Sequence, residues 1–404
     1  MHSRKLKNEY CATWAAVIFL AMGSMTAWGQ ANRPGAGAVG PAGAGAVGPG
    51  STTVGPGGKP GTGLGASGKA VWVNLPDTAM PDKNAAGAKV TPPSKGSFMA
   101  IGVDPTNGEV YAVLTKNQGL FKSTDQGETF KELTGSMNCP GGMYWPGSVN
   151  INPAGKGAIF FGVGGPGALT LDSGATWTNF KPELAPKGFD DGCVAWENDP
   201  KAILAMNHDQ GKVLLSVDLG KTWIDLGAKF NTFGPIGIFD DKTIVARKHP
   251  GELERTTDQG ATWAKAADLS SYKIKNQVIV VFKGVGYLAT DKGLLVSKDK
   301  GATWSIQGAA VNCDVGPFFA DEKRIAVIGP EGCYETTDGG AIWATVALPP
   351  PGANKTNVNA SYTWDPGHDI FYFVQANHPA MKCVIAPAGG VPTPPAKPAM
   401  KATP

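Results

Sequence analysis

Charged side chains are scarce in this chain of 404 residues, and its cysteines are few and far apart. Lys, Arg, Asp and Glu make up 17% of the sequence and leave a formal net charge of +3, so we expect no nucleic-acid partner. The six cysteines form no Cys-x-x-Cys pair, which excludes zinc knuckles and thioredoxin-like chemistry. No stretch has the apolar period of a long helix. The sequence therefore predicts an all-β protein, for which we expect no metal or cofactor.

What the chain does contain is one octapeptide in six near copies. They are STDQGETF (123–130), TLDSGATW (170–177), SVDLGKTW (216–223), TTDQGATW (256–263), SKDKGATW (297–304) and TTDGGAIW (336–343). Their aspartates, spaced by about 40 residues, are Asp125, Asp172, Asp218, Asp258, Asp299 and Asp338. A period near 40 residues with short strands is typical of β-propeller blades.

Each octapeptide has the chemistry of a tight turn between two strands. In SVDLGKTW, the Asp218 carboxylate is suited to accept hydrogen bonds from the following backbone, and Gly220 is suited to the positive φ of the turn. Thr222 and Trp223 favour the returning strand. The copies lack the further oxygen ligands of a calcium loop. We therefore expect the six aspartates to be structural.

The octapeptide resembles the Asp-box, or BNR repeat, S/T-x-D-x-G-x-T-W. This repeat occurs in sialidases, sortilin-type receptors, xyloglucan-degrading endoglucanases and the photosystem II assembly propeller, and the resemblance implies blades without implying an activity. The sialidases use three arginines, one of them in an Arg-Ile-Pro motif. Here the propeller region holds only Arg247, Arg255 and Arg324, without that motif. The xyloglucanases place acid and base on two facing propellers, whereas this chain has room for one.

Residues 70–386 are predicted to form a single seven-bladed β-propeller with four antiparallel strands in each blade. Six blades carry an octapeptide; in the fifth, NQVIVVF (276–282) is the expected inner strand. After Pro351 only three strands remain for the seventh blade. AVWVNLPD (70–77) is similar to the strands that follow the octapeptides, and we expect it to be the missing fourth strand. An N-terminal strand at this position closes the ring and covers a sheet edge.

Both ends of the chain have compositions unsuited to a core. Residues 1–29 have a basic start, a short apolar run and small residues at cleavage offsets, which together predict a signal peptide and a secreted or periplasmic protein. An uncleaved anchor is the alternative, and after cleavage no membrane span is expected. Residues 30–69, rich in Gly, Pro and Ala, are predicted to be a disordered linker, and 387–404 a disordered Pro-rich tail.

An exported protein meets oxidising conditions, in which disulfides are stable. Five cysteines follow residue 29, and we expect Cys139 and Cys193 to pair because both lie in or beside the entry loops of neighbouring blades. The pairing of the other three stays open.

We place the candidate site on the face opposite the octapeptides, where the second-to-third-strand turns and the blade connections lie. The long connection from Gly135 to Gly147 holds Met143, Tyr144 and Trp145. These side chains suit an aromatic platform for a sugar or a protein hot spot; the alternative is that they pack at the channel mouth.

Charged and polar candidates occur on the same face. Asp190 and Asp191 are either a carboxylate pair for general acid and base catalysis or solvated loop residues. His208, His249 and His378 fall in second-to-third-strand turns, but His378 is too many blades away for a three-histidine metal site. The catalytic candidates are Asp190, Asp191, His208 and His249, and the binding candidates are Met143, Tyr144, Trp145, Arg247 and His378.

These observations predict an exported Asp-box propeller that binds a glycan or an extracytoplasmic protein through this face. The alternative is a carbohydrate-active enzyme, a glycoside hydrolase or polysaccharide lyase, that uses the carboxylates and histidines. A third hypothesis is a purely structural component of the cell envelope.

Overall fold

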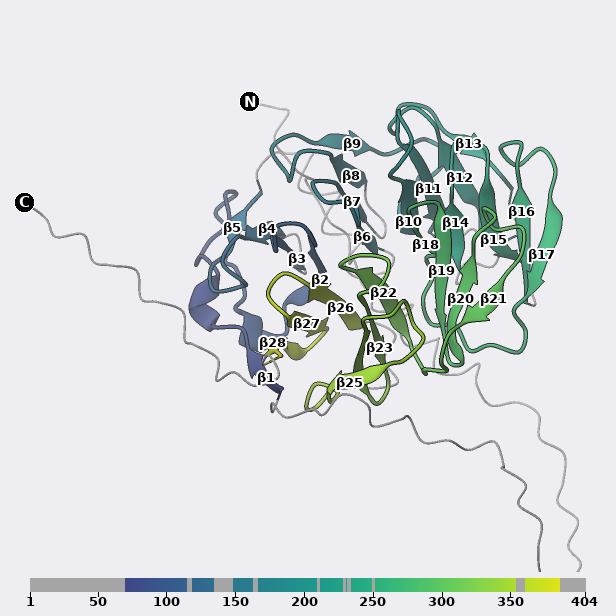
Figure 1. Cartoon of the computed structure of the whole chain (residues 1–404). Coiled ribbons are helices and arrows are strands. Elements are labelled where there is room, and N and C mark those ends of the chain that lie inside the picture. Colours follow the sequence, from purple (N-terminus) through teal and green to yellow (C-terminus); the bar gives the residue numbers. More distant parts are fainter. Residues whose placement is uncertain are drawn as a thin grey trace, which may run out of the picture. The chain divides into compact units, whose positions relative to one another are not determined.

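The computed structural model describes residues 70–114, 118–133, 148–162, 166–208, 211–227, 230, 234–248, 251–353 and 360–385. Within these residues the chain forms seven antiparallel sheets of four strands, arranged as the blades of a ring (Figure 1). The structure therefore confirms the predicted all-β, seven-bladed propeller. The predicted signal peptide, linker and tail lie outside the described residues.

The first blade contains β2 (Phe98–Val103), β3 (Val110–Leu114), β4 (Gly119–Ser123) and β5 (Lys131–Glu132). The second contains β6 (Val149–Ile151), β7 (Ala158–Phe161), β8 (Gly167–Thr170) and β9 (Thr178–Phe180), and the third β10 (Phe189–Ala195), β11 (Ala202–Asn207), β12 (Val213–Ser216) and β13 (Ile224–Asp225). The fourth contains β14 (Ile236–Ile238), β15 (Ile244–Lys248), β16 (Glu252–Thr256) and β17 (Ala264–Asp268).

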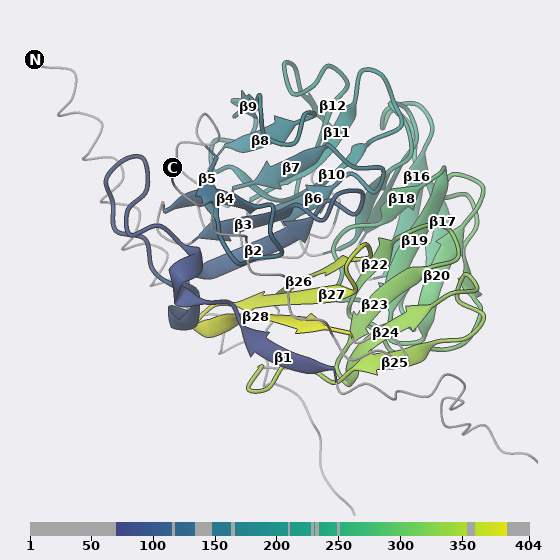
Figure 2. The same ribbon diagram turned by 60° about the vertical axis from the view of Figure 1, so that its left-hand side comes forward.

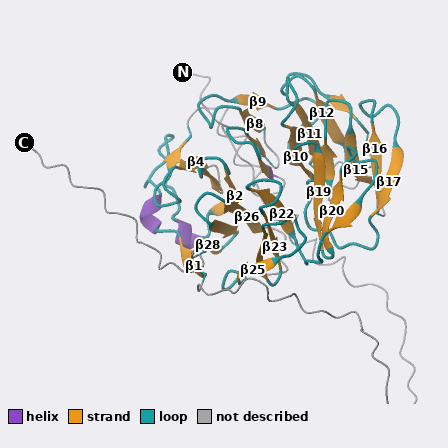
Figure 3. Cartoon of the chain, in the orientation of Figure 1, coloured by secondary structure: helices purple, strands orange, loops and turns teal. Residues whose placement is uncertain are grey.

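The fifth blade contains β18 (Val280–Phe282), β19 (Val285–Thr290), β20 (Gly293–Ser297) and β21 (Ser305–Gln307). The sixth contains β22 (Val315–Phe319), β23 (Ile325–Gly329), β24 (Gly332–Thr336) and β25 (Ala344–Ala347). The seventh combines β26 (Ala360–Asp365), β27 (Ile370–Gln375) and β28 (His378–Val384) with β1 (Val71–Asn74). The described helices are two short 3-10 turns between β1 and β2, η2 (Asp77–Ala79) and η3 (Pro93–Lys95), drawn in purple in Figure 3.

The N-terminal strand joins the last blade, as the sequence predicts. Figure 2 shows β1 beside β28, and their antiparallel register pairs Trp72 with Cys383. The Trp72 ring is 8% exposed and packs edge-on against Phe373, with ring centroids 6.3 Å apart. Its Nε1–H donates to the Leu348 carbonyl oxygen over 2.7 Å, which links the closing strand to the segment after the sixth blade. The two ends of the propeller are thus joined in one sheet.

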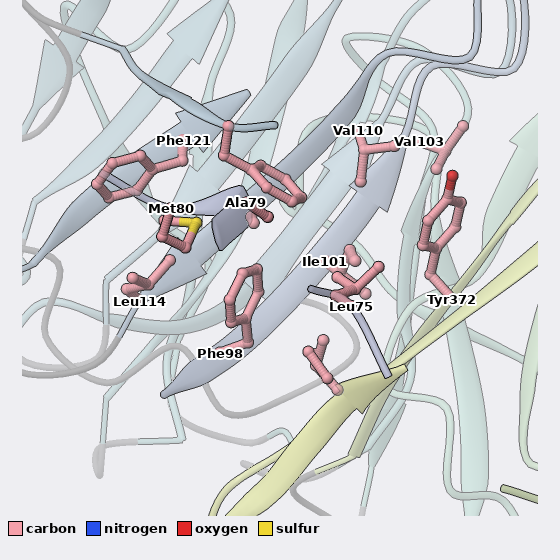
Figure 4. Packing of buried hydrophobic residues seen from close by; sticks show 14 of the residues in the cluster. Leu75, Ala79, Met80, Phe98, Ile101, Val103, Val110, Leu114, Phe121 and Tyr372 are labelled. Carbon is pink, nitrogen blue, oxygen red and sulfur yellow. The ribbon is translucent and has the colours of Figure 1, made fainter. Parts of the chain in front are cut away.

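The core lies between neighbouring blades, because both faces of each sheet are covered. Inner and middle strands such as β11 (AILAMN) are therefore continuous, fully buried apolar runs. Figure 4 shows one interface, where Phe98 and Phe121 of the first blade lie in the same cluster as Leu75 and as Tyr372 of the seventh. Burying each such side chain contributes about 1.5 to 3 kcal/mol.

The octapeptides form turns between the third and fourth strands, and we call them the octapeptide turns. In the third blade, Asp218 Oδ1 accepts from the Thr222 backbone N–H over 2.8 Å and Oδ2 from the Thr222 hydroxyl over 2.6 Å. Gly220 has a φ of 85°, and a Cβ there would lie 3.0 Å from the Phe180 ring of the preceding blade. Glycine therefore satisfies both the positive φ of the turn and the close approach of the preceding blade.

The same hydrogen bonds keep these carboxylates ionised. In the fifth blade, the Thr303 hydroxyl and then the Thr303 backbone N–H lower the pKa of Asp299 to about 2. Such a carboxylate stabilises the fold above its unfolded pKa of about 4. That contribution is lost as the pH falls through 2.

We expect Asp218→Ala to destabilise the propeller modestly. The change leaves the Thr222 N–H and hydroxyl without their acceptor, but water reaches this turn, so the cost should be about 1 kcal/mol. A thermal melt should show a decrease of about 2 °C in melting temperature. An unchanged melting temperature would contradict the structural role of this aspartate.

Candidate functional site

The octapeptide turns share one face of the ring with the first-to-second-strand turns. The other face, which we call the loop face, carries the second-to-third-strand turns and the blade connections. Met143, Tyr144, Trp145 and His249 lie outside the described residues. The candidate site can therefore be described through Asp190, Asp191, His208, Arg247 and His378.

Asp190 and Asp191 belong to β10, the inner strand of the third blade, instead of preceding it. Their side chains are buried, with whole-residue exposures of 3% and 2%. The strand is irregular here, since its register with β11 shifts between Phe189 and Gly192. Of the two alternatives, that of solvated loop residues is therefore wrong, because both acids are buried within β10.

Asp190 contacts a histidine from the end of the neighbouring strand. His208 follows β11, and its Nδ1 forms a hydrogen-bonded contact with Asp190 Oδ1. The His208 backbone N–H donates to the Gly188 carbonyl over 3.0 Å, which fixes the position of the residue. The His208 side chain is 26% exposed and that of Asp190 only 5%. The histidine is thus the accessible member of the pair, and the carboxylate orients it.

Asp191 contacts the connection between the fourth and fifth blades. With its side-chain amide oriented so that both groups are satisfied, Gln277 donates from its nitrogen to Asp191 Oδ1 over 3.1 Å. Burial, and next the charge of Asp190, raise the pKa of Asp191 well above its ordinary range. The Gln277 backbone carbonyl accepts from the Ile236 N–H over 3.0 Å, so three blades meet at this point.

Gln277 is the residue of this group that sequence reasoning missed. It lies in NQVIVVF, predicted as strand from residue 276, whereas β18 begins at Val280. The side-chain nitrogen of Asn276 donates to the Gly316 carbonyl over 2.6 Å. Asn276 and Gln277, ahead of the strand, thus connect the fifth blade to two other blades. In the sequence, the only sign of this role is that two amide residues precede an apolar run.

The channel between the inner strands is narrow and mostly apolar. A cavity of about 110 Å³ is lined by side chains of five blades, among them Ile101, Ile151, Val280, Phe318 and Trp364. Pockets that enclose small-molecule ligands usually measure about 300 to 1,000 Å³. A ligand of sugar size therefore does not fit within this cavity.

Arg247 and His378 lie on the fourth and seventh blades; Arg247 is next to Ala246, which pairs with Ile236, whereas His378 lies three blades further round the ring. Arg247 lies in β15, where its Nε is buried without a hydrogen-bond partner among the described residues. His378 is the first residue of β28, and its Nε2 lies 3.0 Å from the Pro351 carbonyl oxygen. The structure thus unites Asp190, Asp191 and His208, and leaves the other two on separate blades.

Cys193 does not form the disulfide that the sequence predicts. Its thiol is free and buried, and its Sγ lies 3.9 Å from the Ile236 carbonyl oxygen. Burial raises the pKa of this thiol above its ordinary range. The predicted Cys139–Cys193 pairing is therefore wrong, because the strand turns Cys193 into the core.

The part of the chain that the structure describes contains neither a cluster of metal ligands nor a membrane-spanning helix. There, no three His, Cys, Asp or Glu side chains are grouped so that they could hold a metal ion. Among the same residues, no helix has both the length and the apolar character needed to cross a membrane.

The chemistry of the site follows from its burial. Glycosidases use two carboxyl groups that flank the bond to be cleaved and reach the substrate directly. Asp190 and Asp191 are consecutive and almost fully buried, so they are poorly placed for that reaction. A histidine oriented by a carboxylate can instead give and accept hydrogen bonds at the surface.

No protein-family model matches the chain. The dispase autolysis-inducing protein of Streptomyces mobaraensis is 32% identical over 183 residues, which are 44% of this chain and 42% of that protein. The chain thus spans about two fifths of the curated relative that it matches.

This chain is similar to solved propeller structures at low sequence identity. The structure of YCF48 bound to a D1 peptide is 16% identical, with a TM-score of 0.47, over 80% of this chain and 98% of that one. The GH74 enzyme of Niastella koreensis is 15% identical, with a TM-score of 0.41, over 68% of this chain and 47% of that one.

Proposed function

We propose that this protein is an exported Asp-box propeller that binds a protein partner through its loop face. The predicted signal peptide supports export, to the periplasm or the medium. Met143, Tyr144 and Trp145, predicted from the sequence to lie on this face, are the proposed aromatic contacts.

The observation that carries the proposal is the Asp190–His208 pair. The imidazole is partly exposed at the end of β11, and a buried carboxylate fixes its orientation. Fixed polar groups on a rigid surface lose little entropy on binding. Buried carboxylates and the small channel cavity make a carbohydrate-cleaving site the weaker hypothesis.

The name of the curated relative supports a protein partner over a glycan. That protein is named for inducing the autolysis of dispase, which is an effect on another protein. We therefore take dispase as the first probe for this chain.

The proposal is tested by titrating dispase over the immobilised mature protein and its His208→Ala variant. We expect binding by the wild-type protein and at least tenfold weaker binding by the variant, because an oriented hydrogen-bonding group is lost. The double variant Tyr144→Ala and Trp145→Ala should lose about 2 kcal/mol of binding free energy or more.

The chain provides a matched control on the other face. His368 Nδ1 lies 2.7 Å from Asp365 Oδ2, and its side chain is 43% exposed. It follows β26, among the first-to-second-strand turns, so His368→Ala should leave binding unchanged. Equal losses for both histidine variants would contradict the assignment of the loop face. Product release from a polysaccharide panel, abolished by His208→Ala, would replace the proposal with the enzyme alternative.

A further inference from the structure

The outer edge of the closing strand β1 is uncovered. β1 lies at the end of its sheet, beyond β28 (Figure 2). The Leu75 N–H, just after β1, donates to a carbonyl oxygen of β28 over 2.8 Å. Because hydrogen-bonded and non-hydrogen-bonded pairs alternate along an antiparallel ladder, the backbone groups of Val71 and Val73 also face β28. Those of Trp72 and Asn74 therefore face outward, and no described residue bonds to them.

Exposed apolar side chains gather at this edge. Eight large apolar side chains of the described residues are exposed, and four of them lie in or beside β1: Val71, Val73, Val384 and Leu348. Val71 and Val73 are 58% and 45% exposed, and Val384 pairs with Val71 on the same side of the sheet. Leu348 is next to the other side, where its carbonyl oxygen accepts from Trp72 Nε1. An apolar edge strand of this kind is suited to pairing with a strand of another chain.

The outer strands of the other blades are less suited to such pairing. β5, β13 and β17 contain charged side chains, which oppose contact between two edges. β9, β21 and β25 contain no exposed large apolar side chain. Among the outer strands that the structure describes, only β1 combines two exposed large apolar side chains with the absence of charge and proline.

The sequence of β1 is complementary to itself in an antiparallel pair. When Trp72 lies opposite Trp72 of a second copy, the outward N–H and C=O groups of both residues form a hydrogen-bonded pair. Ala70 and Asn74 then form two more such pairs across the two-fold axis. In the same register Val71 lies opposite the second copy's Val73 in a non-hydrogen-bonded pair, where side chains are closest. One symmetric contact therefore satisfies the outward backbone groups and covers the exposed valines.

The charge beside this edge is already balanced. Lys382 of β28 pairs across from Val73 and is buried. Its Nζ donates to the Gln126 carbonyl oxygen over 2.9 Å and forms an ion pair with Glu128. The edge thus offers no unbalanced charge to a charged partner, and a symmetric pair of identical strands requires none.

We propose that two copies of this chain associate through antiparallel pairing of their β1 strands, centred on Trp72. The four-stranded sheets of the two seventh blades then form one continuous sheet. The contact uses the outermost strand of a blade and leaves the loop face free. It therefore stands or falls independently of the proposed protein partner.

Analytical ultracentrifugation of the full mature chain tests the association. Because a pair of short strands is a small interface, the dimer should be weak, and its share should rise between about 10 and 500 µM protein. Val73→Lys places a charge at the edge, and Asn74→Pro removes an outward N–H while keeping the groups that face β28. Each should weaken the dimer about tenfold or more. Leu171→Lys, at a 44% exposed position of the second blade, is the matched control and should leave the dimer unchanged.

Cysteine crosslinking tests the register. A mixture of the Val71→Cys and Val73→Cys proteins should form a disulfide-linked dimer with oxidised glutathione. The reason is that a non-hydrogen-bonded pair places its two Cα atoms about 4.5 Å apart, within the range of a disulfide. Each variant alone should stay monomeric on a non-reducing gel, because identical positions then lie further apart. The wild-type protein controls for the native cysteines.

Four results would overturn the proposal. These are a monomer at every concentration, a dimer that neither Val73→Lys nor Asn74→Pro weakens, crosslinking of Val73→Cys alone, and a dimer that forms only when residues 387–404 are deleted. Crosslinking of Val73→Cys alone would move the centre of the pairing from Trp72 to Val73. Dimerisation only after the deletion would assign the edge to the C-terminal tail.

Discussion

Deletion of residues 70–77 should lower the melting temperature of this propeller by more than about 10 °C. The deletion removes Trp72 and the almost fully buried Leu75, which contacts the first octapeptide turn at Gly127. Truncation of one large core side chain costs about 2 to 5 kcal/mol, and each kcal/mol lowers the melting temperature by about 2 °C or more. The deletion also exposes the edge of β28, where another chain can pair and aggregate.

Thermal melts of the full chain and of the deletion variant provide the measurement. Deletion of eight residues from the predicted linker, 50–57, is the control, and it should leave the melting temperature unchanged. If both deletions gave the same melting temperature, β1 would not be needed for closure.

The second large effect is expected at Asp191. Because its pKa is raised in the folded protein, the unfolded chain loses this proton at lower pH than the folded chain does. The favourable contribution is complete below the unfolded pKa of about 4 and decreases as the pH rises toward the folded pKa. The Asp191 carboxyl group should therefore lower the free energy of unfolding of the wild-type protein at pH 8 relative to pH 4.

Asp191→Asn should remove this penalty. An asparagine of the same shape can both donate to and accept from the Gln277 amide, and it carries no charge to bury. We expect the variant to match the wild-type melting temperature at pH 4 and to exceed it by several degrees at pH 8. Asp190→Asn, which weakens the contact with His208, should destabilise instead. Parallel melting curves for wild type and Asp191→Asn across this range would show that the carboxyl is not desolvated.

Much of the fold could be predicted because the octapeptide acts locally. Asp218, Gly220 and Thr222 interact within a single turn, so their spacing alone identifies the turn in every copy. Closure by β1 was also predictable, because Trp72 occupies the place of an octapeptide Trp in a strand of the same pattern. The six octapeptides thus predicted the ring of blades. The seventh blade, with only three strands at its C-terminal end, predicted the closing strand.

The candidate site was less predictable because its contacts join distant segments. Asp190 and Asp191, followed by Gly192, have the composition of a turn, yet an irregular strand buries them. Their partners, His208 and Gln277, come from another strand and from another blade connection. Local composition does not report such contacts, so the sequence identified three members of the group but not their burial.

The most direct test of the central claim is amide hydrogen exchange of the mature protein with and without dispase. Binding through the loop face should slow exchange in the peptides that cover residues 186–192 and 205–213, around Asp190 and His208. The peptides that cover the octapeptide turn 216–223 and the 364–370 turn should exchange at unchanged rates. Protection confined to the octapeptide turns, with none around His208, would contradict the account.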